Sequence, residues 1–431
     1  MDQLVSRLLL YGDLGEEAIL SKLAALFQAW KGSSMPRQTL VRGIYHQVKG
    51  LLDLATEYGF DENLWQNYLT FLLMTNENSF SLITERVGAQ DGSVNHFARN
   101  DFRVFRALFH YDFSAVEGDL NLDCFTTLSH YKAIAKHGRR YNQNVSEKVR
   151  DLSRRLAAAP DDETFFRLVT EHYRQYGVGM LGLNKAFRIQ SGPEGIGFIP
   201  IYNTDKVMLR DLVGYESQKA QLRHNTEAFL AGRSANNALL YGDAGTGKSS
   251  SVKAIANEFA PEGLRLVEVK KNQLYQIPDL MDKLAANPLK FILFIDDLSF
   301  TANDDNFAAL KAILEGSVGG RARNIAVYAT SNRRHLIKET LTDRTGDDIH
   351  EADTRQELMS LSARFGLTVT FQRPEKARFE TILEELARQH HIQMPMDQLL
   401  VKAEAFAIRA GGRSPRVAKQ FIEQCEAGVQ K

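Results

Sequence analysis

The stretch ALLYGDAGTGKSSSVKAI, residues 238–255, decides the fold of this chain. From Gly242 to Ser249 it satisfies the pattern G-x-x-x-x-G-K-[ST], with an apolar strand-like segment before it and a helix-forming segment after it. This context matters because the backbone N–H groups of such a loop turn inward around phosphates, and the N-terminus of the following helix adds a partial positive charge. The stretch therefore predicts a nucleotide-binding loop.

The residues of this loop have distinct predicted tasks. Three glycines allow the backbone to wrap around the phosphates, Lys248 reaches the β- and γ-phosphates, and the hydroxyl of Ser249 ligates Mg²⁺. The set expected to bind the nucleotide is Gly242, Asp243, Ala244, Gly245, Thr246, Gly247, Lys248, Ser249 and Ser250. The expected cofactors are ATP and Mg²⁺. A glycine-rich turn without function is the alternative, and the intact Lys-Ser pair in its strand and helix context argues against it.

A second motif, FILFIDD at residues 291–297, supplies carboxylates. Its five apolar residues deliver Asp296 and Asp297 to the C-terminal end of a buried strand, where open α/β sheets place their ligands. Asp296 is the expected carboxylate on the Mg²⁺ side. Asp297 is placed to polarise a water for attack on the γ-phosphate. The alternative is a strand end whose acids merely begin a loop.

Strand-like and helix-like segments alternate around these motifs. The strand-like segments are 237–241, 264–269, 291–295, 324–330 and 367–371. Helix-like segments begin at Lys248 and lie near 273–286 and 304–315. This alternation predicts βαβ crossovers and a parallel sheet with helices on both faces. The apolar character of 291–295 suits a strand covered on both sides.

The rest of the chain reads as helical. Apolar residues recur at three- and four-residue spacing from Glu16 to about Tyr176, which predicts an all-α domain. Residues 177–203 are rich in Gly, which is typical of a linker or loose hairpin. The predicted organisation is therefore a helical N-terminal domain (1–195), a linker (196–210), a nucleotide-binding α/β core (211–373) and a helical lid (374–431).

Composition places few limits on partners. Hydrophobic residues make up 44% and charged residues 25%, and 53 basic residues balance 53 acidic ones. These values are ordinary for a folded soluble protein, and no overall charge attracts a polyanion. Cys124 and Cys425 match no metal-ligand or redox spacing, as in a reducing compartment. No apolar run approaches the ~20 residues that span a bilayer, and the start of the sequence does not resemble a signal peptide, so we expect a cytoplasmic protein without membrane insertion.

Taken together, these motifs and three later ones resemble the AAA+ ATPases. The strand NIAVYATSN ends in Asn332, which matches the sensor-1 position that orients the attacking water in that superfamily. SLSARFGL places Arg364 where AAA+ proteins carry the arginine finger that reaches into the next subunit's site. GGRSPRVAKQF resembles the sensor-2 helix of the lid, and Ser414 and Pro415 are N-cap and N1 signals that put Arg416 in its first turn. The resemblance implies an α/β P-loop NTPase fold of AAA+ type that assembles into homo-oligomers.

More narrowly, the motifs from LVGYE to the Ser-Pro-Arg helix look like a bacterial group of predicted ATPases, the domain of unknown function 815. The resemblance also implies that DLVGYESQKAQL, residues 211–222, lies near the adenine. One departure is Asp297, since most AAA+ enzymes place Glu there, and a shorter carboxylate polarises water less well. Asp297 therefore supports an alternative, in which the protein is a slow or non-hydrolysing switch of loader or adaptor type.

Each of these arginines also has an interpretation that gives it no role at the nucleotide site. Arg364 also suits a surface ion pair, because a finger that acts on another subunit is not recognisable without an assembly. Arg413 lies three positions before Arg416 and competes with it for the phosphate. Arg333 and Arg334 are either supporting or solvated residues and are not assigned to the site.

Four weaker patterns occur elsewhere in the sequence. GVGMLG at 177–182 fits G-x-G-x-x-G but follows a helix-like segment, where a dinucleotide site needs a strand. LITERVGAQDGSVNHF at 82–97 has helix-turn-helix spacing, which ordinary helical hairpins share. Basic residues outnumber acids between Tyr131 and Leu156, and a solvated helix face is the main reading of that excess. EGSVGGRARN at 315–324 has the composition of a pore loop. The segment LRLVEV, however, is not followed by the aromatic-hydrophobic-Gly loop that AAA+ unfoldases carry there.

The function predicted from the sequence is ATP hydrolysis with Mg²⁺ that drives or regulates remodelling of a macromolecular partner through the helical N-terminal domain. A protein partner is favoured over nucleic acid. A P-loop kinase is a third possibility, but no acceptor pocket is recognisable in the sequence.

Overall fold

The computed structural model describes residues 1–15, 17–134, 143–192, 195–202, 206–299, 310–311, 313–314, 322–332 and 363–428. The chain forms two compact units. The N-terminal unit runs to Lys185 and takes in a short piece that begins at Pro200. The C-terminal unit comprises Ala186–Ile199 and the rest of the chain.

The described part of the N-terminal unit is helical, as predicted. Its helices are α1 (Asp2–Val5), α2 (Ile19–Lys31), α3 (Arg37–Tyr58), α4 (Leu64–Thr75), α5 (Ser79–Val87), α6 (Ser93–Phe109), α7 (Ser114–Leu120), α8 (Cys124–Ser129), α9 (Gln143–Ala157), α10 (Asp162–Tyr176) and α11 (Gly179–Leu183). Their apolar faces meet in one core, in which Leu69 and Phe105 are fully buried. The hydroxyls of Tyr11 and Tyr173 are hydrogen-bonded at 2.6 Å, and Tyr173 donates to the carbonyl of Leu73. Buried hydroxyls need such partners, so this pair is part of the core packing.

Within the described residues of the C-terminal unit, seven strands form one sheet. They are β1 (Ala186–Gly192), β2 (Gly195–Pro200), β3 (Ala238–Gly242), β4 (Leu264–Glu268), β5 (Lys290–Ile295), β6 (Ile325–Ser331) and β7 (Leu367–Phe371), in the order β2-β1-β4-β5-β6-β3-β7. The pairs β1–β4, β4–β5, β5–β6, β3–β6 and β3–β7 are all parallel. The predicted parallel sheet is therefore confirmed, with β3 flanked by β6 and β7.

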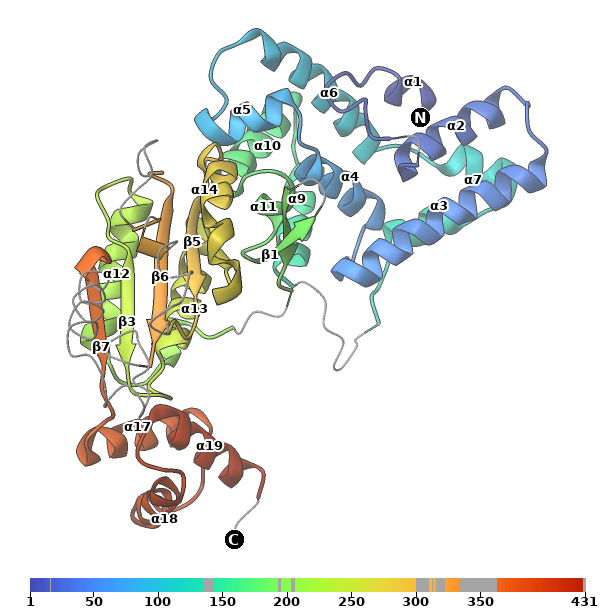
Figure 1. Cartoon of the computed structure of the whole chain (residues 1–431). Helices are drawn as coiled ribbons and strands as arrows, with labels where there is room; N and C mark the ends of the chain where they lie inside the picture. Colours follow the sequence, from blue (N-terminus) through green and yellow to red (C-terminus); the bar gives the residue numbers. More distant parts are fainter. Residues whose placement is uncertain are drawn as a thin grey trace. The chain divides into compact units, whose positions relative to one another are not determined.

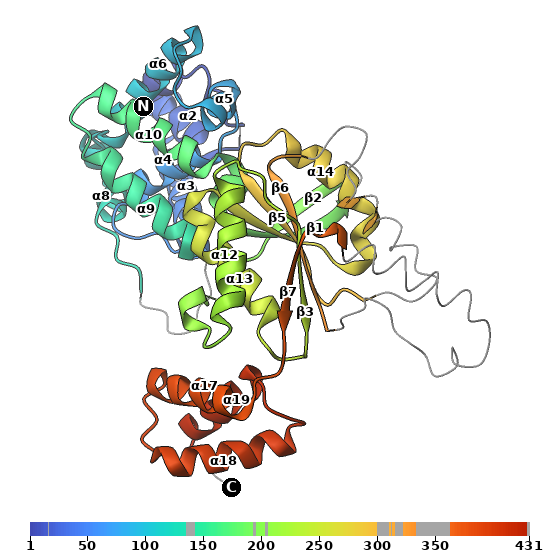
Figure 2. The same cartoon turned by 90° about the vertical axis from the view of Figure 1, so that its left-hand side faces the viewer.

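Helices cover both faces of this sheet. Helices α12 (Glu216–Leu230) and α13 (Lys248–Phe259) lie on one face, and α14 (Ile277–Ala285) lies on the other (Figure 2). Double coverage explains why the residues of β6 are buried throughout. Short 3₁₀ turns accompany these helices, at Leu209–Asp211, Ala260–Glu262 and Lys271–Gln276. The predicted helix near 304–315 lies largely outside the described residues.

The hairpin β1–β2 differs from the expectation of a helical domain to 195 and a linker at 196–210. Strand β1 extends the sheet, with Ala186 opposite Leu266 and Arg188 opposite Glu268. Phe187 is fully buried, whereas the next residue, Arg188, is exposed and forms an ion pair with Glu268. This alternation is the strand pattern, and the high glycine content around it concealed the signal.

The lid consists, in its described part, of α17 (Lys376–Gln389), α18 (Met396–Arg409) and α19 (Pro415–Glu426), drawn in red in Figure 1. Leu399, Ile382 and Ile422 lie in its buried core. These are the helices that the pattern after Pro374 predicts. No helix in the described ranges is both long enough and apolar enough to cross a membrane.

Candidate functional site

The predicted phosphate loop connects the end of β3 to the start of α13. Gly242, Gly245 and Gly247 have φ of 136°, 78° and 95°, values that L side chains rarely adopt. A Cβ at Gly242 would lie 2.0 Å from the carbonyl oxygen of Phe371 in β7, so no side chain fits there. All three glycines are therefore needed for backbone direction, and Gly242 is needed for space as well.

Lys248 lies inside the loop, with 5% of its surface exposed. Its ammonium donates to the carbonyl of Gly242 at 2.9 Å and to that of Asp243 at 2.6 Å. Burial lowers the pKa of Lys248, and the carboxylates around it, Asp243 first, partly oppose that shift. A buried cation held mainly by carbonyls gains a stronger partner when an anion enters the loop.

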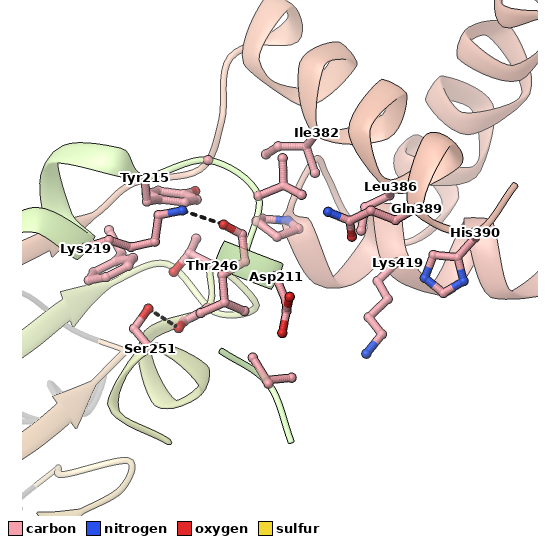
Figure 3. Close-up of a pocket in the computed structure, with 17 residues that line it drawn as sticks. Asp211, Tyr215, Lys219, Thr246, Ser251, Ile382, Leu386, Gln389, His390 and Lys419 are labelled. Carbon is pink, nitrogen blue, oxygen red and sulfur yellow. Dashed lines mark hydrogen bonds between the residues drawn. The ribbon is translucent and has the colours of Figure 1, made fainter. Parts of the chain in front are cut away.

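Other hydroxyls brace the loop internally. Thr246 donates to the carbonyl of Asp243 at 2.8 Å, and Ser251 donates to the carbonyl of Gly247 at 2.9 Å (Figure 3). Ser250 is half-buried in the first turn of α13, and Ala244 is exposed at the loop tip. The loop is thus shaped by contacts within the chain.

The structure brings Ser249 and Asp296 together. The hydroxyl of Ser249 donates to Oδ1 of Asp296 at 2.6 Å, between the start of α13 and the end of β5. The same carboxylate oxygen accepts a second hydrogen bond, from the hydroxyl of Thr330 at 2.6 Å. The two residues expected on the metal side are therefore neighbours, one in the first turn of a helix and the other just after the carboxyl end of a strand.

Asp297 has an unusual backbone. Its φ of 54° puts a non-glycine residue in the left-handed region, which typically costs about 1–3 kcal/mol and persists only where neighbours hold it. Its N–H donates to the hydroxyl of Thr330 at 2.9 Å, and its Oδ1 accepts from the side-chain amide of Asn332 at 2.8 Å. Asn332, predicted as sensor 1, thus contacts the residue predicted to polarise water.

Thr330 is a site residue that the sequence reasoning missed. It is 2% exposed, lies in β6 opposite Leu240 of β3, and its carbonyl accepts from the N–H of Leu298. The available signal was its position two residues before Asn332, because side chains two apart in a strand share a face.

A pocket of ≈ 220 Å³ adjoins the loop (Figure 3). Its walls come from the segment before α12, from the loop and from the lid: Val207, Asp211, Leu212, Val213, Gly214, Tyr215, Lys219, Thr246, Gly247, Ser251, Phe371, Ile382, Leu386, Gln389, His390, Pro415 and Lys419. Much of this lining is apolar, and polar side chains come both from the lid and from the segments around the loop. The pocket has the features of a small-molecule site.

The segment before α12 is held in place by two side chains. Lys219 donates to the carbonyl of Leu212 at 2.6 Å, which is one of the dashed lines in Figure 3. Tyr215 has φ 58°, donates to the carbonyl of Gln372 at 2.6 Å and lies with its ring 5.3 Å from that of Phe371. Burial raises the pKa of Tyr215 to about 12, so its hydroxyl stays a donor at neutral pH.

The lid touches the loop directly. The N–H of Arg416 donates to the carbonyl of Gly245 at 3.1 Å, at the start of α19. Ser414 caps that helix, since its hydroxyl accepts from the N–H of Val417, which confirms the N-cap prediction. The N–H of Arg373 donates to Oδ2 of Asp243 at 2.8 Å. Backbone N–H groups therefore link the loop to the first turn of α19 and to the segment just before α17.

The two competing arginines have different surroundings. Arg413 forms a two-pronged ion pair with Glu404, with Nη2 to Oε1 at 2.6 Å and Nε to Oε2 at 3.0 Å. That guanidinium lowers the pKa of the Glu404 carboxyl. Arg416 has an exposed side chain at the loop and no ion-pair partner among the described residues.

Arg364 is not brought to the loop of its own chain. It is half-buried and directly precedes β7, whose residue Leu367 is in register with Ala238 at the start of β3. The loop follows the other end of β3, about 16 Å away at ~3.3 Å per residue of strand. Arg364 and the phosphate loop therefore lie at opposite edges of one sheet.

The weaker patterns resolve as ordinary structure where they are described. GVGMLG follows α10 and forms α11, so it is no dinucleotide loop. Ile83 and Val87 are 50% and 52% exposed, so they do not form the buried core that a helix-turn-helix needs. In α9, Lys148 donates to the carbonyl of Gly182, and Arg150 pairs with Glu62.

Several predicted features fall outside the described residues. They are Lys136, Arg139, Arg140, Arg333, Arg334 and most of the 315–324 segment.

The profile of a family described as "Protein of unknown function (DUF815)" matches residues 183–429. The chain belongs to this family. The match begins just before β1, which agrees with the hairpin being part of the C-terminal unit. With its phosphate loop on β3, its parallel sheet and its helical lid, this DUF815 protein has the α/β P-loop fold of AAA+ type.

Other comparisons reach only part of this DUF815 chain. It is 35% identical over 135 residues to the replication factor C large subunit of Staphylothermus marinus, which covers 28% of the chain and 30% of that protein. The chain thus spans less than a third of the curated relative it matches. Solved structures include the RuvB Holliday junction branch migration motor of Thermotoga maritima (TM-score 0.35, 16% identity, 51% of this chain and 64% of that chain). Another is the FIGL-1 AAA domain in complex with ADP (TM-score 0.36, 16% identity, 52% and 74%).

Proposed function

We propose that this protein is a Mg²⁺-dependent AAA+ ATPase. The observation that carries the proposal is the hydrogen-bonded row from Ser249 through Asp296, Thr330 and Asp297 to Asn332, which lies beside a phosphate loop. Such a row supplies one carboxylate for a metal and another for a water, which is what hydrolysis of a phosphoanhydride requires.

ATP would occupy the loop and the adjoining pocket. Gly242 to Ser250 bind the phosphates, with Lys248 turning from carbonyl partners to phosphate oxygens. The 211–215 segment and the lid enclose the base in the ≈ 220 Å³ pocket. Enclosure of the base between apolar walls would exclude water and limit the motion of the bound nucleotide.

Ser249 and Asp296 would hold the metal. Both offer oxygen atoms, and Mg²⁺ commonly takes one or two protein oxygens and completes its shell with phosphates and water. The described residues hold no cluster of three or more His, Cys, Asp or Glu, so the chain offers no closed metal cage there. When bound, Mg²⁺ neutralises charge on the transferring phosphoryl group.

The remaining residues act on the reaction. Asp297 orients and polarises the water, Asn332 holds the Asp297 carboxylate, and Arg416 approaches the phosphates from the lid. Arg364 would serve the site of a neighbouring subunit, since its own loop is at the other edge of the sheet, and the protein is therefore a homo-oligomer. Such a finger contributes ~10³ to 10⁵ in rate where it has been tested.

The helical N-terminal unit would engage a macromolecular partner that hydrolysis remodels or regulates. A protein partner is favoured over nucleic acid, because the α9 residues Lys148 and Arg150 are engaged within the chain. The free thiols of Cys124 and Cys425 suit the cytoplasm.

A second candidate is a slow ATP-dependent switch of loader or adaptor type. The observation that favours it is the short side chain of Asp297 in a left-handed conformation, which restricts where its carboxylate can reach.

The test is ATP hydrolysis by the wild type, by Arg364→Ala and by mixtures of the two, across protein concentrations, with oligomer mass followed in parallel. If the ATP sites are shared between subunits, turnover should rise with assembly, and Arg364→Ala should bind ATP but hydrolyse it poorly. Turnover that stays negligible and independent of concentration and of Arg364 would favour the switch.

A further inference from the structure

The hydroxyl of Thr330 joins the two acidic residues of the site. It donates to Oδ1 of Asp296 at 2.6 Å and accepts from the backbone N–H of Asp297 at 2.9 Å. Thr330 is 2% exposed, so neither contact competes freely with solvent.

The direction of these hydrogen bonds is determined by chemistry. The N–H of Asp297 can only donate, and an ionised carboxylate can only accept. A threonine hydroxyl has one proton, which must therefore point at Asp296. The row runs in one direction, from the Asp297 N–H to the Thr330 hydroxyl to the Asp296 carboxylate, and polarisation along such a row strengthens each bond.

Ser249 also donates to Oδ1 of Asp296, but it is the residue that a metal would recruit. Thr330 is the donor that remains for Asp296 in that state. It also satisfies the N–H that the left-handed backbone of Asp297 directs toward β6. One side chain therefore contacts both acidic residues, through the carboxylate of Asp296 and the backbone N–H of Asp297, and it lies outside the FILFIDD motif that contains them.

We propose that Thr330 is a positioning residue that couples the metal-side carboxylate of Asp296 to the water-side residue Asp297. The inference rests on the proposed function. It predicts that loss of the hydroxyl weakens both the Mg²⁺-dependent part of nucleotide binding and the chemical step, although Thr330 touches neither metal nor nucleotide.

The informative variants are Thr330→Val, which keeps shape and β-branching but removes the hydroxyl, and Thr330→Ser, which keeps it. Thr226→Val is the matched control, because Thr226 is a fully buried threonine whose hydroxyl bonds to Leu222 and Tyr328 away from the carboxylates. Affinity for a fluorescent ATP analogue is measured with Mg²⁺ and with EDTA, and kcat and KM are measured for ATP.

For Thr330→Val we expect unchanged ATP-analogue affinity in EDTA and at least a threefold smaller gain in affinity from Mg²⁺. The kcat should fall by about tenfold to a hundredfold, which is the loss typical of a hydrogen bond to a charged group, and KM should stay within twofold of wild type. Thr330→Ser should restore both and Thr226→Val should change neither. A Thr330→Val protein that keeps the wild-type Mg²⁺ gain and kcat overturns the inference, as does a Ser variant that behaves like Val. If the wild type itself gains no affinity from Mg²⁺, the proposed function fails and the inference fails with it.

Discussion

The side-chain amide of Asn332 donates to Oδ1 of Asp297 across 2.8 Å, from the end of β6 to the residue after β5. The bond engages one carboxylate oxygen of Asp297, and it opposes rotation of a side chain whose backbone is already constrained at φ 54°. Position and charge of this carboxylate are therefore separate contributions to any hydrolysis.

The variant Asp297→Asn separates the effect of the side chain's position from the effect of its charge. Asparagine adopts the left-handed backbone region readily, so the variant keeps the conformation and loses only the negative charge. We expect nucleotide affinity within threefold of wild type and a kcat lower by about 10²–10⁴, the range attributed to a positioned general base. Steady-state hydrolysis and analogue binding measure the two quantities. Wild-type turnover in Asp297→Asn would remove Asp297 from the mechanism.

Lys248→Met tests the buried ammonium of the loop. ATP at about 100 times its Kd stabilises a protein by ~2.7 kcal/mol, which is roughly 5–10 °C in Tm for a unit of this size. The variant should lose that shift. Without nucleotide it should be at least as stable as wild type, because burial already disfavours the charged lysine, as its lowered pKa indicates.

The control is Lys253→Met, a lysine of the same helix outside the loop, which should keep the ATP-induced shift. A retained shift in Lys248→Met would contradict the assignment of the loop as the phosphate site.

The two lid arginines should give opposite results. Arg416→Ala should lower ATP affinity or kcat by about tenfold or more, as expected for a lost contact to a charged group, and leave lid stability unchanged. Arg413→Ala should lower stability only slightly, as expected when a solvent-exposed ion pair is lost, with nucleotide binding intact. Thermal unfolding and analogue binding of both variants decide the matter, and the reverse pattern would make Arg413 the sensor.

Glu85 gives the N-terminal unit a predicted pH dependence. Its side chain is 4% exposed and accepts from the N–H of Val178 at 3.0 Å, and burial raises its pKa above the ordinary 4.5. The folded unit therefore holds this proton more tightly than the unfolded chain does. Its contribution is fully present below about pH 4.5 and is lost as pH rises through the raised pKa.

Glu85→Gln keeps an acceptor for Val178 and removes the titration. Its Tm should exceed that of wild type at pH 8 and should fall less between pH 5 and pH 8. Glu147→Gln, on the exposed face of α9, is the control. Parallel Tm profiles for wild type and Glu85→Gln would show that Glu85 does not titrate on unfolding.

The elements predicted best were those whose signal is local. The phosphate loop, the strand before Asp296 and the N-cap at Ser414 each depend on residues within about ten positions, and the structure has all three. A linker or loose hairpin was predicted for 177–203, but not that its strand β1 would join the sheet, because the partner of β1, β4, is more than seventy residues further along the chain.

Thr330 was missed for a related reason. A threonine in a buried strand is ordinary by itself, and its role appears only when β5 and β6 are aligned and Asp297 turns its N–H toward it. The roles assigned to Asn332, Arg364 and Arg416 remain predictions, and the variants of Arg364 and Arg416 test two of them.

The chain leaves the helical unit at Lys185 and enters β1 at once, without free residues between them. Tension applied to the helical unit would consequently load the β1–β4 ladder along the strand direction, where several hydrogen bonds share the force. The first strand of the sheet is therefore also the point at which the chain passes from one unit to the other.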